Sequence, residues 1–135
     1  MATPQGDAAE VLQGAHAMTD VTGFGLAGHL MLICRASEVT AKVSLENVPV
    51  YVGAEALADA GHRSSIYADN KAAAPVFGQA SPKAALLHDP QTSGGFLAAV
   101  AADEAIGLVA RLRAAGHDAA AIGEVSAGEP AITLS

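Results

Sequence analysis

The chain has 135 residues, a formal net charge of −7 at pH 7 and one cysteine. This length suits a single domain with a core of its own. The acidic balance argues against nucleic acid or an anionic membrane surface as a partner, because either would need a basic face. The lone Cys34 excludes an internal disulfide and a thiolate metal cluster within one chain, and its apolar neighbours favour a buried, inert thiol.

No apolar run approaches the roughly 18 residues that a membrane-spanning helix needs. The start of the chain lacks the basic and apolar regions of a secretory signal. We therefore expect a cytoplasmic protein that contacts no membrane. Hydrophobic residues make up 51% of the chain and aromatic residues 4%, so the core must be built mainly from Ala, Val, Leu and Ile.

Hydrophobic periodicity and turn residues predict the elements of the first half in chain order. A short helix over 7–13 is followed by an extended segment at 16–19 and by a largely buried helix over 26–36. A strand over 39–45 alternates apolar and polar residues without error, and a helix over 52–60 follows. The segment 63–80 is predicted as a surface connection with a helical turn near 69–74, where Asn70 has the character of a turn residue.

The second half begins with 84–87, which lead into a polar turn and then a strand over 95–100. That strand is apolar on both faces, as expected in the middle of a covered sheet. A helix over 104–115 is predicted to be capped by Asp103 and to have Ile106, Val109 and Ala110 on its apolar side. Strands over 119–125 and 131–134 are joined by five residues with Gly and Pro, which predicts a hairpin. The order indicates an α+β fold, an α/β sandwich with helices on one face of a mixed sheet.

The first of two polar, glycine-rich stretches is TDVTGFGLAGH, over 19–29, which runs into the predicted buried helix. Backbone N–H groups at such a turn and at the start of a helix have no intrahelical partner, so they suit a phosphate. Asp20 suits Mg²⁺, which prefers carboxylates shared with waters and phosphates. The alternative is that Asp20 and Thr22 only satisfy backbone donors while the glycines supply positive φ.

The second stretch is DPQTSGG, over 89–95, which precedes the predicted strand. Two glycines after two hydroxyl residues present another patch of backbone donors beside polar side chains. We expect neither the GxxxxGK[ST] pattern of P-loops nor the GxGxxG pattern of dinucleotide-binding loops, so a nucleotide is not held by those devices. The seven Lys and Arg residues are scattered, and any phosphate site must therefore rely on the backbone, a metal or another domain.

Together these two motifs, about 70 residues apart and with His16-Ala17-Met18 before the first, resemble the C-terminal domain of selenophosphate synthetases. These enzymes are also called selenide, water dikinases and are similar to aminoimidazole ribonucleotide synthetase. The resemblance covers essentially the whole chain, whereas we expect a family member to be about twice as long, with an additional N-terminal domain. It implies the fold of aminoimidazole ribonucleotide synthetase C-terminal domains.

The resemblance implies that 1–135 form the C-terminal domain of a two-domain, cytoplasmic, homodimeric enzyme. Such enzymes convert ATP, selenide and water into selenophosphate, AMP and phosphate with Mg²⁺. The N-terminal domain, which we expect to be absent from this chain, supplies most ATP contacts and the catalytic residues, so no catalytic residue is assigned here. Asp20 is implied as a Mg²⁺ ligand. The implied cleft residues near the phosphates are Thr22, Gly23, Gly25, Thr92, Ser93, Gly94 and Gly95.

Two other functions stay open: the C-terminal domain of a related ATP-dependent synthetase acting on purine precursors, and a non-catalytic anion-binding or assembly domain. The spacing of the five histidines argues against a zinc site. His29 and His88 either flank one cleft or form local hydrogen bonds. Because one carboxylate binds Mg²⁺ weakly and phosphoryl transfer needs several positioned charges, we expect the chain alone to be inactive.

Overall fold

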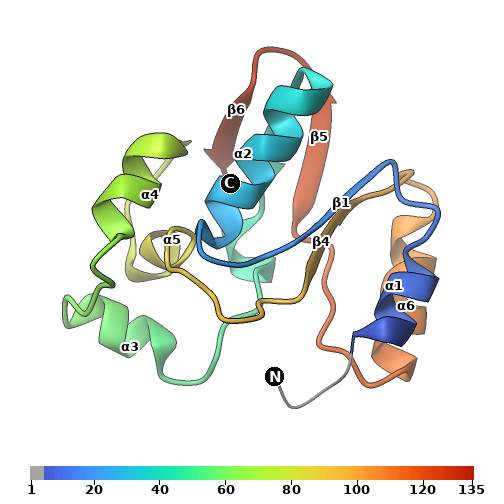
Figure 1. The fold of residues 1–135 in the computed structure, drawn as a ribbon, viewed down its shortest axis with the longest axis horizontal. Helices are drawn as coiled ribbons and strands as arrows, with labels where there is room; N and C mark the ends of the chain where they lie inside the picture. The colour runs from blue at the N-terminus through green and yellow to red at the C-terminus, as the bar shows by residue number, and fades with distance from the viewer. Residues whose placement is uncertain (1–4) are drawn as a thin grey trace.

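The computed structural model describes residues 5–135, which form two separate sheets and the helices around them (Figure 1). The helices are α1 (Gly6–Val11), α2 (Gly25–Ser37), α3 (Ala54–Asp59), α4 (Tyr67–Ala73), α5 (Pro82–Leu86) and α6 (Ala105–Ala114), with a 3₁₀ turn η1 (Leu45–Asn47). The strands are β1 (Ala17–Asp20), β2 (Val39–Val43), β3 (Val76–Phe77), β4 (Phe96–Ala99), β5 (Gly123–Ala127) and β6 (Ala131–Leu134). One sheet is a β1–β4 ribbon, and the other is mixed, in the order β3-β6-β2-β5. The predicted α+β class with a mixed sheet is confirmed.

Helix α2 lies against the four-stranded sheet and forms the centre of the main core (Figure 1). Its buried side carries Leu30, Ile33 and Cys34, as the periodicity predicted. Cys34 is 0% exposed, so the prediction of a buried thiol is confirmed, and burial raises the pKa of that thiol. None of the helices within 5–135 has the length and apolar character needed to span a bilayer.

The predicted hairpin between the last two strands is wrong. Strand β2 lies between them, pairing antiparallel with β5 and parallel with β6. The connecting residues cross the start of β2, where the amide of Gly128 donates to the carbonyl of Glu38 at 3.2 Å and Thr40 Oγ1 donates to the carbonyl of Glu129 at 2.6 Å. A strand that lies between two others satisfies the backbone hydrogen-bonding groups of both. A short connecting loop therefore does not by itself determine which strands pair.

The β1–β4 ribbon separates two apolar clusters. Leu97 on β4 packs into the main core, whereas Phe96 and Ala98 face a second cluster formed by Ala8, Leu12 and Leu112 of the α1 and α6 segments. The prediction that this strand is covered on both faces is therefore confirmed. Its expected place in the middle of a sheet is wrong, because within the described residues β4 pairs with β1 alone.

Helix α6 differs from its predicted orientation and capping. Ile106 is 83% exposed, and Leu112 is the buried residue that faces α1. Residue Glu104 occupies the N-cap position without a side-chain hydrogen bond, so Asp103 does not cap the helix. The apolar residues of this helix are spread so widely around it that the sequence pattern was compatible with either of two buried faces. Packing against α1 buries the face centred on Leu112.

The segment 63–80 is more ordered than predicted, since it contains α4 and the short strand β3. Asn70, expected to be a turn residue, lies within α4 and is 6% exposed. Strand β3 pairs with β6 at the edge of the sheet. The partners of this segment come from distant parts of the chain, so local sequence carried no signal for them.

Candidate functional site

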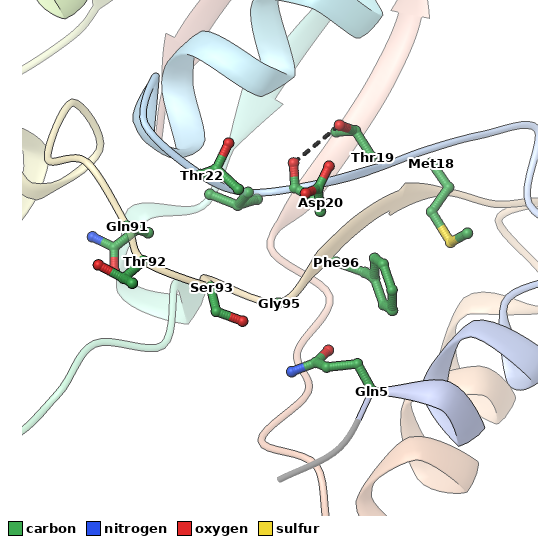
Figure 2. Close-up of a pocket in the computed structure, with 11 residues that line it drawn as sticks. Gln5, Met18, Thr19, Asp20, Thr22, Gln91, Thr92, Ser93, Gly95 and Phe96 are labelled. Carbon is green, nitrogen blue, oxygen red and sulfur yellow. Dashed lines mark hydrogen bonds between the residues drawn. The ribbon is translucent and has the colours of Figure 1, made fainter. Parts of the chain in front are cut away.

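An open groove of about 790 Å³ lies along one face of the β1–β4 ribbon. Figure 2 shows the first motif on one side of it and the second motif on the other. The lining residues are Gln5, Met18, Thr19, Asp20, Val21, Thr22, Gln91, Thr92, Ser93, Gly95 and Phe96. Two stretches 70 residues apart therefore meet, as their shared chemistry predicted.

Backbone hydrogen bonds join the two motifs beyond the end of the ribbon. The amide of Val21 donates to the carbonyl of Gly95 at 2.9 Å, and the amide of Gly94 donates to the carbonyl of Val21 at 2.8 Å. The amide of Gln91 donates to the carbonyl of Thr22 at 3.0 Å. Two residues of one strand thus oppose Val21 in the manner of a β-bulge, a feature that often lies beside binding sites.

The turn that leads into α2 packs against the start of the second motif. Gly25 has φ +69°, and a Cβ atom there would lie 2.8 Å from the carbonyl oxygen of Leu87. The amide of Gly25 donates to the carbonyl of Thr22, and the amide of Ala27 donates to Leu87. These donors are used inside the chain, and Gly23 and Gly25 do not line the groove. The amides of Gly25 and Ala27 are therefore not free to bind a phosphate, contrary to the prediction for this helix start.

The glycines of this turn also have the GxGxxG spacing of dinucleotide-binding loops, at Gly23, Gly25 and Gly28. That fingerprint requires a parallel βαβ unit whose helix N-terminus faces the pyrophosphate. Here the preceding strand β1 pairs antiparallel with β4, and the helix start is covered by the Leu87 segment. The expectation that the GxGxxG pattern is absent is therefore wrong, but the structure excludes the dinucleotide-binding arrangement itself.

The second motif presents the donors that face the groove. Within 5–135, the backbone N–H groups of Thr92 and Ser93 form no hydrogen bond, and both residues are exposed. Ser93 has φ +129°, a conformation that costs free energy for a residue with a side chain. Strained backbone with free donors and hydroxyls concentrates at binding sites, so this loop is the stronger candidate for holding an anion.

Asp20 ends β1 with its carboxylate exposed to the groove. The hydrogen bond in Figure 2 runs from Thr19 Oγ1 to the backbone carbonyl of Asp20 at 3.0 Å, which leaves the carboxylate free. No group of three or more His, Cys, Asp or Glu residues within 5–135 could hold a metal ion. A Mg²⁺ ion at Asp20 would need its other ligands from waters, phosphates or another polypeptide.

The other end of the groove is apolar, and sequence reasoning missed it. The pairing of Asp20 with Phe96, and the period of two along β1, place Met18 and Phe96 on the same face as Asp20. Gln5 approaches from the start of α1 (Figure 2). The signal available in the sequence was the alternation of β1, which puts Met18 two residues from Asp20.

The two motif histidines form local hydrogen bonds and do not line the groove, so the hypothesis that they flank a cleft is wrong. His29 Nε2 accepts the backbone N–H of Thr22 at 3.0 Å, which places the ring proton on Nδ1. His88 is 4% exposed, and its Nε2–H donates to the carbonyl of Ala74 at 3.0 Å. Burial lowers the pKa of His88, and the nearby charge of Lys71 adds to this effect.

Comparison with known proteins shows which sequences the chain is similar to. Residues 4–134 match the family described as AIR synthase related protein, C-terminal domain. Proteins named "Selenide, water dikinase" from Bdellovibrio bacteriovorus, Myxococcus xanthus and Burkholderia pseudomallei are 41%, 40% and 40% identical to the chain. These matches cover 82%, 88% and 96% of this chain but only 33%, 35% and 38% of the relatives.

The chain thus spans about a third of the length of the curated relatives it matches, and the expectation of about half is wrong. The family match nevertheless extends over nearly all of the described residues and includes both motifs of the groove. The predicted resemblance to selenide, water dikinases is confirmed at about 40% identity. The chain belongs to the family of AIR synthase related protein C-terminal domains.

Proposed function

We propose that this chain is the C-terminal part of a selenide, water dikinase and forms one wall of its Mg-ATP site. The observation that carries the proposal is the meeting of Asp20 with the donor-bearing loop at Thr92 and Ser93 in a single groove. Its volume of about 790 Å³ suits a nucleotide-sized ligand. The relatives that share both the family and about 40% identity carry the name of this activity.

Each predicted site residue has a distinct part in this proposal. Asp20 supplies one carboxylate oxygen to Mg²⁺, and the hydroxyls of Thr92 and Ser93 donate to phosphate oxygens. Thr22 lines the groove beside them, with its own hydroxyl donating to His29 Nε2 at 3.2 Å. The other predicted site residues are glycines, which have no side chain to bind a ligand and act through the shape of the backbone: Gly23, Gly25, Gly94 and Gly95. Bound Mg²⁺ would neutralise charge on the phosphates, which is the main electrostatic requirement of phosphoryl transfer.

The wall described here is an incomplete site. No Lys or Arg of residues 5–135 lines the groove, although phosphoryl transfer requires positive charge around the transferred group. We propose that the N-terminal part of the enzyme supplies these charges, most ATP contacts and the catalytic residues. The complete enzyme would then convert ATP, selenide and water into selenophosphate, AMP and phosphate as a cytoplasmic homodimer, and the chain alone would be inactive.

Titration calorimetry with Mg-ATP tests the proposal. The chain is titrated alone and then with the N-terminal two thirds of the Myxococcus xanthus relative supplied as a separate polypeptide. We expect a binding signal and selenide-dependent AMP formation only in the mixture, and loss of both with Asp20→Ala. The matched control is Asp59→Ala, an exposed carboxylate on α3 outside the groove.

Three outcomes would count against this assignment. AMP formation by the chain alone would show that the site is complete without a partner. Binding of Mg-ATP that persists in Asp20→Ala would remove the metal role of that carboxylate. AMP or ADP formation in the mixture without any dependence on selenide would favour a related ATP-dependent synthetase instead.

A further inference from the structure

Asn70 connects the two motifs from behind the groove. Its Nδ2 donates to the carbonyl of Gly23 at 2.9 Å and to the carbonyl of His88 at 3.1 Å. Gly23 directly follows Thr22, which lines the groove, and His88 directly precedes the second motif. One side chain on α4 thus bonds both segments that form the groove, although Asn70 does not line it.

Helix α4 is itself held in place by the second segment. The ring of His88 donates from Nε2 to the carbonyl of Ala74, directly after α4, at 3.0 Å. The ring of Tyr67 meets the ring of His88 edge-on, with 6.0 Å between centroids. His88 therefore accepts from Asn70 through its backbone and donates to the end of α4 through its side chain. This reciprocal contact fixes the distance between α4 and the start of the second motif.

The chemistry at position 70 requires an amide. Two carbonyl oxygens from different segments need two donor hydrogens on one short, buried side chain, and the NH₂ group of asparagine supplies both. Aspartate has the same shape but would place acceptors against both carbonyls. Alanine would leave both carbonyls without this donor in a buried position, where an unsatisfied polar group is costly.

We propose that Asn70 is a positioning residue that sets the separation between the first-motif turn and the second-motif loop. Backbone hydrogen bonds of Val21 with Gly94 and Gly95 join the two segments beside Asp20, and Asn70 adds a second fixed contact, between Gly23 and His88. The role of the groove in holding Mg-ATP rests on the proposed function above, whereas the positioning by Asn70 is a property of this chain and can be tested without nucleotide.

Amide hydrogen exchange, followed by NMR on the 135-residue chain, tests this proposal. The probes at the groove are the amides of Gln91 and Gly94, which donate to Thr22 and Val21. The reference probes are the amides of Ser44 and Ser135, which donate to Ile122 and Val43 beside the four-stranded sheet. In Asn70→Asp we expect exchange at the groove probes to rise by about tenfold more than at the reference probes, because one segment loses its anchor.

Two control variants separate positioning from general loss of stability. Ile132→Val removes one methylene from a side chain that is 1% exposed in the main core, and its effect should be similar at both sets of probes. Asn47→Asp introduces the same chemical change at an exposed site on η1 and should alter neither set. Equal acceleration of groove and reference probes in Asn70→Asp, as in Ile132→Val, would overturn the proposal.

Asn70→Ser provides a milder variant that keeps one donor hydrogen, and it carries the same test if Asn70→Asp does not fold. Its groove probes should be accelerated selectively but less than in the aspartate variant. Failure of Mg-ATP binding leaves the exchange comparison unaffected, so the two proposals fail separately.

Discussion

Gly25→Ala tests how tightly the first-motif turn packs against the second motif. A residue with a Cβ atom at φ +69° costs about 1–2 kcal/mol relative to glycine. The new atom would also lie 2.8 Å and 2.9 Å from the carbonyl oxygens of Leu87 and Asp89 and 2.9 Å from the carbonyl carbon of His88. These are backbone atoms, so the segment must move, which weakens the hydrogen bond from Ala27 to Leu87 by about 1 kcal/mol. The expected loss in the free energy of unfolding is about 2–4 kcal/mol.

Urea unfolding followed by circular dichroism measures this loss, with the m-value confirming that the unfolded state is unchanged. The matched control is Gly107→Ala in α6, where a Cβ atom meets nothing within 4 Å. That control should stabilise the chain by about 0.5–1 kcal/mol, because alanine favours a helix interior. A change at position 25 smaller than about 0.5 kcal/mol would refute the inferred contact between the two motifs.

Three further predictions concern the groove and the buried histidine. Ser93→Gly should raise the free energy of unfolding by about 1 kcal/mol in urea unfolding, because glycine accepts φ +129° without strain; a loss of stability would contradict the strain. Asp20→Ala should change stability by less than about 0.5 kcal/mol, since its carboxylate is exposed and unbonded within 5–135. A larger loss in the same assay would reveal a structural role for Asp20. Because burial lowers the pKa of His88, the unfolded chain binds a proton that the folded chain excludes. Stability should therefore fall as pH drops below about 6.5. His88→Gln should flatten that dependence in unfolding curves between about pH 7 and pH 5, whereas an unchanged slope would assign it to other groups.

The local pattern of apolar residues was enough to predict much of the fold. The spacing of Leu30, Ile33 and Cys34 placed the buried side of α2, and the alternation through Ala41 and Val43 placed β2. These predictions succeeded because a helix or strand with one covered face repeats its apolar residues with its own period. The hairpin between β5 and β6 failed because pairing depends on which strand lies between them, and that information is not local.

The sequence by itself determined the two motifs, the carboxylate Asp20, the buried thiol and the α+β class, since residue type and periodicity encode them directly. Only the tertiary structure decided which groups are available to a ligand. Among the described residues 5–135, it engaged the amides of Gly25 and Ala27 in hydrogen bonds and left those of Thr92 and Ser93 without one. It also placed Asn70 between two distant segments. A hydrogen bond between residues tens of positions apart exists only once the chain has folded, because its partners share no local pattern.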